Sequence, residues 1–355
     1  MQTCPAPDVL RVSQADCAPL GRASGKASWL ASQIRLSDHI HQLTQAECDE
    51  LDAALRQAVA GRWNPARAGA APFTLGTFAK TLAKWRHRLE TGNGFCIFRG
   101  IPVQRYAPHE RALLLCGIGR YLGRIMPQNA NGELLNHVRA KPGASQRGYQ
   151  SGTALPFHSD PCDLVGLLCL RPAESGGKSA IASTHAIHDA LLEHRPDLLQ
   201  TLYRSFHIER HEASPHTPPF YTTPVFMWQA GELFSRFNPG YIFSAQRHPQ
   251  TPRLTSGQID ALETFEQLCH TDLFRLDAML EPGDLQFLNN HCLVHSRSAY
   301  QDDKDPALKR HLLRLWLCAR DAVHLPAPMR DLHRDMERWQ ASACLPPEPE
   351  DGLCG

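Results

Sequence analysis

The spacing of hydrophobic positions changes along the chain and separates a helical N-terminal part from a body of short strands. Residues 43–61 predict an amphipathic helix, and Thr44 followed by Glu47 is the capping-box pattern that begins one. The apolar residues expected on one face of this helix are Leu51, Ala54, Leu55 and Val59. Further helices are predicted over 73–90 and 109–123, and between them the glycine-bounded apolar run of 92–103 favours a buried strand.

From about residue 133 the apolar runs shorten to strand length, and turn residues separate most of them. These runs are ELLNHVRA, PFHSDPC, LVGLLCL, KSAIAS, SFHIER, ELFSRF, DLQFLNN, CLVHSRS and HLLRLWLCA. Only two long helices, over 184–203 and 255–274, interrupt them. Many short strands with few helices between them favour an antiparallel sandwich or barrel, so we expect a mainly β fold with helical additions, α+β in class. The first thirty residues and the end, 346–355, are expected to be loosely structured.

Composition narrows the range of functions. The 355 residues are 42% hydrophobic and 21% charged, which excludes overall disorder, and 37 Lys and Arg against 36 Asp and Glu leave a net charge of +1. That balance provides no field for a nucleic acid or an anionic membrane, and no apolar run approaches the roughly 20 residues of a membrane helix. We see no secretory signal, and the 12 scattered cysteines form no CxxC pair, so we expect a reduced, cytoplasmic protein.

Histidine is abundant, with 19 residues, so a motif that rests on one histidine says little. The triplet His-x-Asp/Glu occurs at His158–Asp160, His207–Glu209, His270–Asp272 and His333–Asp335. The last two fall in predicted helices, where positions i and i+2 do not face each other, whereas the first two fall in extended segments, where they do. His158 and Asp160 stand between prolines and offer two of the three ligands of a facial metal triad. A third ligand is available as His291 or His295, and strand periodicity does not choose between them.

Three segments together resemble a known family. PFHSDPCDLVGLLCLRPAESGGKSAIAS, EPGDLQFLNNHCLVHSRSAYQDD and KRHLLRLWL are similar to the Fe(II)- and 2-oxoglutarate-dependent dioxygenases of the taurine dioxygenase (TauD/TfdA) type. The family order is HxD, a distal His, then an Arg some 15 residues on, which here gives His158 to Asp160, His295 and Arg310. The family's Asn five residues before the distal His fits Asn290 and selects His295. The resemblance spans at least 150–320 and implies a double-stranded β-helix, or jelly roll.

The resemblance also implies roles and a domain division. His158, Asp160 and His295 are expected to bind Fe(II), and Arg310 with Ser179 the far carboxylate of the cosubstrate 2-oxoglutarate; O2 is the oxidant, and succinate and CO2 are released. We expect an N-terminal helical region at 1–90 that packs on the core, the oxygenase domain at 91–335, and a tail at 336–355.

The substrate is expected to be a small polar metabolite. Arg314 shares a strand face with Arg310, and it is predicted either to meet an anionic group of the substrate or to form an ion pair with an acid such as Asp284. Phe157 and the loop 127–137 are expected at the substrate mouth. An anionic or zwitterionic substrate follows from the first alternative for Arg314.

Several alternatives remain open from the sequence. The same chemistry can end in hydroxylation, desaturation, epoxidation or ring formation. A second class of function is a non-catalytic jelly-roll sensor or binding protein that keeps the metal. A zinc hydrolase is disfavoured, because the sequence has no HExxH motif. A homo-oligomer is possible.

Overall fold

The computed structural model describes the chain apart from residues 1–20, 24, 68–71, 141–150, 211–217 and 348–355. Most of the N-terminal segment and of the C-terminal end that we expected to be loosely structured therefore lie outside the described residues. Described residues 21–30 contain neither helix nor strand.

Two sheets form the body of the molecule. The larger has the order β1 (Ile40–Gln42), β2 (Phe95–Arg99), β14 (Leu285–Asn289), β6 (Leu164–Arg171), β17 (His311–Cys318) and β3 (Arg124–Met126), and β4 (Leu135–Val138) also pairs with β17. The smaller has the order β13 (Arg275–Ala278), β8 (Ser179–Ser183), β15 (Leu293–Arg297) and β5 (Leu155–His158). All neighbouring strands run antiparallel except β1 and β2. Apolar side chains of both sheets share one buried cluster, so the sheets pack face to face as in the predicted jelly roll.

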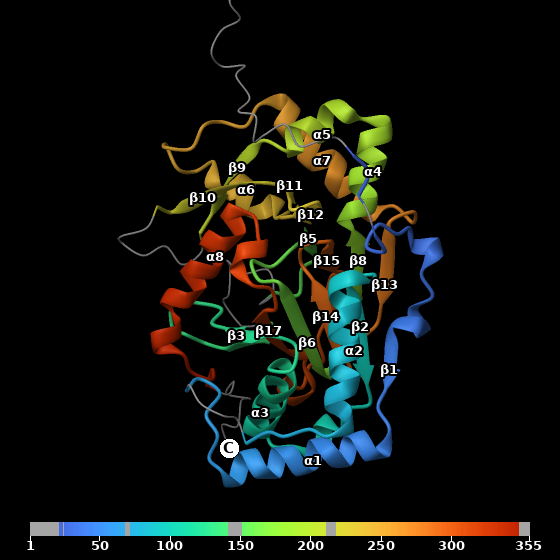
Figure 1. Ribbon diagram of the computed structural model, residues 1–355, viewed down its shortest axis with the longest axis vertical. Coiled ribbons are helices and arrows are strands. Elements are labelled where there is room, and N and C mark those ends of the chain that lie inside the picture. Colours follow the sequence, from blue (N-terminus) through green and yellow to red (C-terminus); the bar gives the residue numbers. More distant parts are fainter. Residues whose placement is uncertain (1–20, 24, 68–71, 141–150, 211–217, 348–355) are drawn as a thin grey trace, which may run out of the picture.

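Three helices from the N-terminal third cover the outer face of the larger sheet (Figure 1). They are α1 (Gln45–Ala60), α2 (Thr77–Thr91) and α3 (Pro108–Gly119). The predicted capping box of Thr44 and Glu47 is present at the start of α1. Val59, however, is 40% exposed while Ala58 is buried. Ala58 lies seven residues after Leu51 and returns to within about 20° of it around the helix, whereas Val59 lies about 80° from Leu51.

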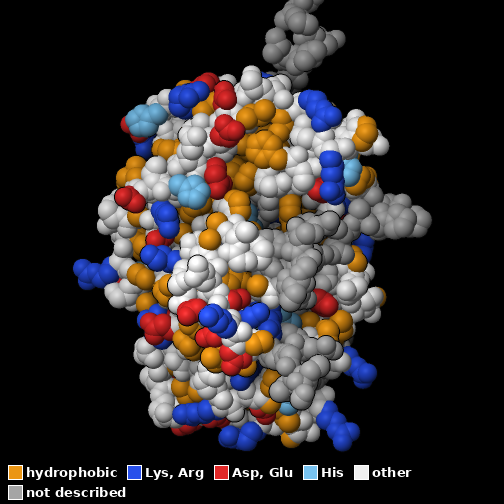
Figure 2. Space-filling model, turned by 180° about the vertical axis from the view of Figure 1, so that it is seen from behind, with side chains coloured by type: hydrophobic (Ala, Val, Ile, Leu, Met, Phe, Trp, Pro, Cys, Tyr) orange, Lys and Arg blue, Asp and Glu red, His pale blue; other side chains and the backbone are white. Residues whose placement is uncertain are grey.

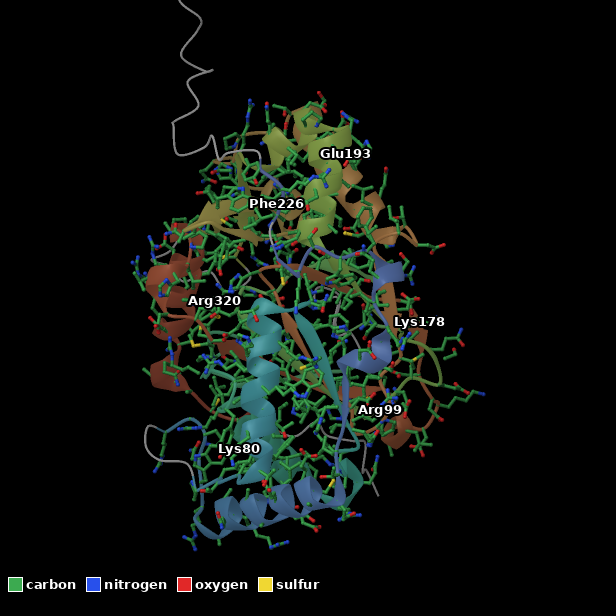
Figure 3. All side chains as sticks on the ribbon, turned by 45° about the vertical axis from the view of Figure 1, so that its right-hand side comes forward. Lys80, Arg99, Lys178, Glu193, Phe226 and Arg320 are labelled. Carbon is green, nitrogen blue, oxygen red and sulfur yellow. The ribbon has the colours of Figure 1, made fainter. Side chains whose placement is uncertain are left out.

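A second helical layer covers the outer face of the smaller sheet, at the upper end in Figure 1. Its helices are α4 (Thr184–His194), α5 (Pro196–Leu202), α6 (Pro239–Ala245) and α7 (Ser256–His270), and its hairpins are β9 (Ser205–Glu209) with β10 (Phe220–Pro224) and β11 (Phe226–Gln229) with β12 (Glu232–Ser235). The single helix predicted over 184–203 is two helices, since Pro196 starts a new one and the preceding Arg195 has a non-helical backbone. Figure 3 labels Phe226 within this layer.

The remaining elements are short or lie at the periphery. α8 (Ala327–Arg338) runs along one side and contains His333 and Asp335, which were predicted to lie in a helix. β7 (Ser175–Gly176) pairs with β16 (Tyr300–Gln301). The 3-10 turns are Ala31–Gln33, Leu36–His39, Val103–Arg105, Pro306–Leu308, Ala322–His324 and Gln340–Ser342. The domain boundaries at 90 and 335 stay a prediction.

The molecular surface agrees with the balanced composition on the face shown in Figure 2, where basic and acidic side chains are interspersed. Among the described residues, no helix is both long enough and apolar enough to cross a membrane.

Candidate active site

The predicted ligand residues meet between the two sheets. His158 at the end of β5 and His295 in β15 are direct register partners, and their ring centroids are 4.3 Å apart. Asp160 lies two residues beyond His158 on the same extended segment, with its Oδ2 3.8 Å from Nε2 of His295. That Oδ2 is buried and has no hydrogen-bond partner. Three donor groups from distant parts of the sequence therefore surround one point, and one carboxylate oxygen there is unused.

The protonation states of these groups suit a metal ion. Burial, followed by the nearby charge of His158, lowers the pKa of His295 to about 3, and burial also lowers the pKa of His158. Burial alone would raise the pKa of Asp160, but the Arg314 guanidinium and the two histidines hold it below its usual value. At neutral pH the group is thus two neutral imidazoles and one carboxylate, the donor set of a facial Fe(II) triad.

Hydrogen bonds orient the predicted ligand residues. Nδ1 of His158 lies 2.9 Å from the carbonyl of Pro156, which can only accept, so Nδ1 carries the proton and Nε2 keeps its lone pair for a metal. The backbone N–H of Asp160 donates to Oδ1 of Asn290 at 3.0 Å. Between the two ligands, the carbonyl of Ser159 accepts from the buried Arg236. These contacts fix the extended segment from both sides.

A pocket that is partly open to solvent lies against these residues. The residues that line it are Val138, Leu155, His158, Leu167, Ser179, Gln286, His295, Ser296, Arg297, Arg310, Leu312 and Arg314. The strand alternation explains this lining: Ser179 of β8 and His295 of β15 point inward, whereas Ala180 and Val294 pack under the outer helices. The predicted Ser179, Arg310 and Arg314 are therefore brought together beside the ligand residues.

Arg310 precedes β17 and is only 4% exposed. Its backbone N–H donates to Oδ1 of Asp302 at 2.8 Å, and its Cζ lies 5.2 Å from the ring centroid of Tyr300. Its Nη1 is buried and has no hydrogen-bond partner. Arg310 thus presents a buried cation with an unused donor at the pocket wall.

Arg314 forms an ion pair with an acid, as one alternative predicted, but the acid is Asp160 and not Asp284. Asp284 instead accepts two hydrogen bonds, at 2.9 and 2.8 Å, from Arg99, the residue labelled in Figure 3. Nη1 of Arg314 lies 3.3 Å from Oδ1 of Asp160, and its Nε donates to Oε1 of Gln128 at 2.9 Å. Because Gln128 belongs to the loop 127–137, Arg314 links that loop to the carboxylate of the triad.

Phe157 is not among the lining residues of this pocket. It is fully buried in the apolar cluster beneath the outer helices, and its ring lies 5.1 Å from that of His270. The reason is the strand period of two, which turns Phe157 away from the side on which His158 lies.

The other histidine pairs have partners elsewhere. His270 contacts Glu266 at 3.2 Å, Glu209 contacts His248 at 2.9 Å, and His291 contacts Asp163 at 2.8 Å. Of the two histidines that periodicity left open, His295 lines the pocket beside His158 and His291 does not.

Sequence reasoning missed Arg297, Tyr300 and Arg236. Arg297 had a signal, since it lies two residues after His295 in a predicted strand and so shares its face. Arg236 had none, because its contact with Ser159 joins residues far apart in the sequence.

The sequence profile described as "Taurine catabolism dioxygenase TauD, TfdA family" matches residues 57–316. FR-33289 synthase of Streptomyces rubellomurinus is 30% identical over 282 residues, which cover 76% of this chain and 80% of that protein. Taurine hydroxylase-like protein SAT17 of Stachybotrys chartarum is 29% identical over 314 residues, which cover 83% of this chain and 79% of that protein.

Solved structures with this fold include two iron oxygenases. Asparagine oxygenase in complex with Fe(II), 2S,3S-3-hydroxyasparagine and succinate aligns with a TM-score of 0.61 and 20% identity, covering 79% of this chain and 94% of that one. The non-heme iron oxygenase OrfP in complex with Fe and alpha-ketoglutaric acid aligns with a TM-score of 0.61 and 16% identity, with the same two coverages. These likenesses confirm the predicted jelly roll.

Proposed function

The chain belongs to the taurine catabolism dioxygenase TauD, TfdA family, and from this premise we propose that it hydroxylates a C–H bond of a small anionic or zwitterionic metabolite. It is an oxidoreductase that uses Fe(II), 2-oxoglutarate and O2 and releases succinate and CO2. The family sets the class of reaction. The roles of individual residues and the class of substrate are proposed from the site of this chain.

His158, Asp160 and His295 are the proposed iron ligands. The observation that carries the proposal is the buried meeting of two neutral imidazoles with an ionised carboxylate whose Oδ2 has no partner. When bound there, Fe(II) supplies the activation of O2, coupled to decarboxylation of 2-oxoglutarate, that removes a hydrogen atom from the substrate. The protein holds the ligands in place through Pro156 and Asn290.

Arg310 and Ser179 are the proposed ligands of the far carboxylate of 2-oxoglutarate. A planar guanidinium can donate two parallel hydrogen bonds to a carboxylate, and Nη1 of Arg310 is buried without a hydrogen-bond partner. Ser179 lines the same pocket and adds a hydroxyl. This arrangement favours a dicarboxylate as cosubstrate.

Arg314 is the proposed contact for the anionic group of the substrate. It lines the pocket next to Asp160, so a substrate anion beside it would lie close to the iron ligands. Its bond to Gln128 connects it to the loop 127–137, which we propose as part of the substrate mouth. The names of the similar proteins support this class, since one is taurine hydroxylase-like and another is an asparagine oxygenase.

The test is a screen of wild-type protein for substrate-stimulated succinate release. Pairs of small molecules that differ only in a charged group are compared: amino acids with their amides, and sulfonates with their alcohols. We expect the anionic member of a pair to stimulate release and to gain one oxygen atom, as measured by mass spectrometry. Stimulation by the neutral members alone would refute the proposed substrate class, and loss of two hydrogen atoms would replace hydroxylation by desaturation.

The remaining properties are proposed on other grounds. The described cysteines are all free thiols, which supports a reducing compartment such as the cytoplasm. A small-molecule partner follows from the pocket. Homo-oligomerisation stays a prediction.

A further inference from the structure

The pocket contains a second buried arginine, Arg297, that the roles above do not use. Arg297 lies two residues after His295 in β15, so both side chains face the same side of the strand. In the pairing of β15 with β8, Arg297 stands opposite Ser179. Arg297 therefore occupies the same pocket wall as the residues proposed for the far carboxylate of 2-oxoglutarate.

The main chain holds one side of the Arg297 guanidinium. Its Nη2 donates to the carbonyl of Ser151 at 2.9 Å and also to the carbonyl of Thr153. Its Nη1 is buried and has no hydrogen-bond partner, although the residue is only 5% exposed. The side chain is thus fixed in position and retains one unused donor.

Two further unused polar atoms lie on its neighbours. The Cζ atoms of Arg297 and Arg310 lie 4.6 and 5.2 Å from the ring centroid of Tyr300, so both guanidiniums contact one aromatic ring. Nη1 of Arg310 and the hydroxyl of Tyr300 are also buried without a partner. Burying a single donor without an acceptor costs free energy, so three such groups on residues in contact point to an absent acceptor.

Two cationic side chains lie at this wall, with Asp302 near both. No Asp or Glu is among the described residues that line the pocket, and neither Arg297 nor Arg310 forms an ion pair with a described residue. Both guanidiniums contact the ring of Tyr300, so the two cations lie close together. A bound anion would relieve the repulsion between two cations in a poorly solvated place.

We propose that Arg297 is a second residue for the far carboxylate of 2-oxoglutarate, to which its Nη1 donates and through which the site selects a dicarboxylate. A carboxylate has about four lone-pair positions, and Arg310, Arg297, Ser179 and Tyr300 offer a matching set of donors. This inference rests on the proposed function, because it places 2-oxoglutarate beside Arg310. It adds a selectivity that a purely structural arginine would not provide.

The test is anaerobic calorimetry of the Fe(II)-loaded protein with two ligands. 2-Oxoglutarate has the far carboxylate, and 2-oxobutyrate has the same 2-oxo acid end without it. We expect Arg297→Gln to weaken binding of 2-oxoglutarate by about ten- to a hundred-fold and to leave 2-oxobutyrate unchanged. The matched control is Arg275→Gln in β13, which removes the same charge from a residue outside the pocket lining and should change neither affinity.

Equal weakening of both acids by Arg297→Gln, or no change in either, would overturn the inference, since Arg297 would then only anchor residues 151–153. Thermal unfolding of the metal-free proteins establishes whether each variant is folded. If Arg297→Gln is not folded, Arg297→Lys is tested instead by the ratio of its affinities for 2-oxoglutarate and 2-oxobutyrate. A loss of affinity confined to 2-oxoglutarate supports the inference, and an unchanged ratio overturns it. A wild type that does not prefer 2-oxoglutarate refutes the proposed cosubstrate site instead.

Discussion

Asp163→Asn is expected to destabilise the folded protein by about 3–6 kcal/mol, although Asp163 is not a proposed ligand. The carboxylate is 1% exposed and accepts four hydrogen bonds. Two come from His291 at 2.8 Å and His333 at 3.1 Å, and two from the backbone N–H groups of Ala319 and Arg320 at 2.8 and 2.9 Å. His333 lies in α8, and Arg320, which Figure 3 labels, follows the end of β17. One carboxylate therefore joins that helix to the end of β17 and to the segment before β15.

The magnitude follows from the number of donors. Each hydrogen bond to a charged group contributes about 1.5–3 kcal/mol. Burial alone would raise the pKa of Asp163, but the hydrogen bonds from His291 and His333 hold it far below its usual range, so the group is ionised at neutral pH. Asparagine keeps one acceptor oxygen and turns an NH2 group toward donors, so about half of these bonds are lost. Since a domain is stable by only about 5–15 kcal/mol, the effect is large.

The assay is urea unfolding at pH 7, followed by circular dichroism. The matched control is Asp277→Asn, which removes a partly exposed carboxylate that pairs with Arg275 and should cost about 0–1 kcal/mol. An Asp163→Asn protein within about 1 kcal/mol of the wild type would refute the reasoning. Asp163, Cys318 and His333 also lie close enough to share a metal ion. If they did, a chelator would destabilise even the Asp160→Ala protein, which is expected to have lost iron from the other site. If Asp163 serves only the hydrogen-bond network, the chelator should leave the stability of that protein unchanged.

Further predictions concern the cosubstrate, the substrate and pH. Arg310→Lys should weaken 2-oxoglutarate binding by about ten- to a hundred-fold in calorimetry, because a planar pair of donors becomes a point charge; unchanged affinity in a folded variant would remove Arg310 from the site. Arg314→Ala should abolish stimulation of succinate release by the anionic substrate while 2-oxoglutarate still binds. A retained response would mean that Arg314 pairs with Asp160 and does not contact the substrate. Burial lowers the pKa of His185 to about 4 and of His311 to about 2, so the stability they contribute is complete above the unfolded pKa near 6.5 and is lost as pH falls. Each of the two histidines should lower the free energy of unfolding by about 2 kcal/mol between pH 7 and 5. His185→Asn should reduce the measured dependence of the free energy of unfolding on pH, and an unchanged dependence contradicts this.

Local patterns were enough to predict much of the fold. The capping box at Thr44 and the strand-length runs around His158 and His295 depend on neighbouring residues, and the structure has these elements at those places. The break at Pro196 was equally local, but the continuous apolar pattern on both sides of it concealed it. Pairing order depends on distant contacts, so the parallel β1–β2 pair could not be predicted from periodicity.

The site was predictable to the extent that its residues lie on one strand or one motif. His158 with Asp160, and Arg310 with Arg314, share faces by the period of two, and the same rule would have found Arg297. The partner of Arg314 could not be predicted, because Asp160 is 154 positions away and the choice between it and Asp284 is made by tertiary packing. Phe157 was predicted at the substrate mouth because it precedes His158 in the sequence. Adjacent residues of a strand point to opposite faces, however, and Phe157 lies in the apolar cluster under the outer helices.

The most direct test of the account is the anaerobic absorption spectrum of the protein with Fe(II) and 2-oxoglutarate. We expect a metal-to-ligand charge-transfer band in the wild type and in His207→Ala, because His207 lies on β9 and is not among the residues that line the pocket. We expect Asp160→Ala to lose the band through loss of iron while its circular dichroism stays that of a folded protein. A folded Asp160→Ala protein that keeps the band, or a folded His207→Ala protein that loses it, would contradict the assignment of His158, Asp160 and His295 as the iron site.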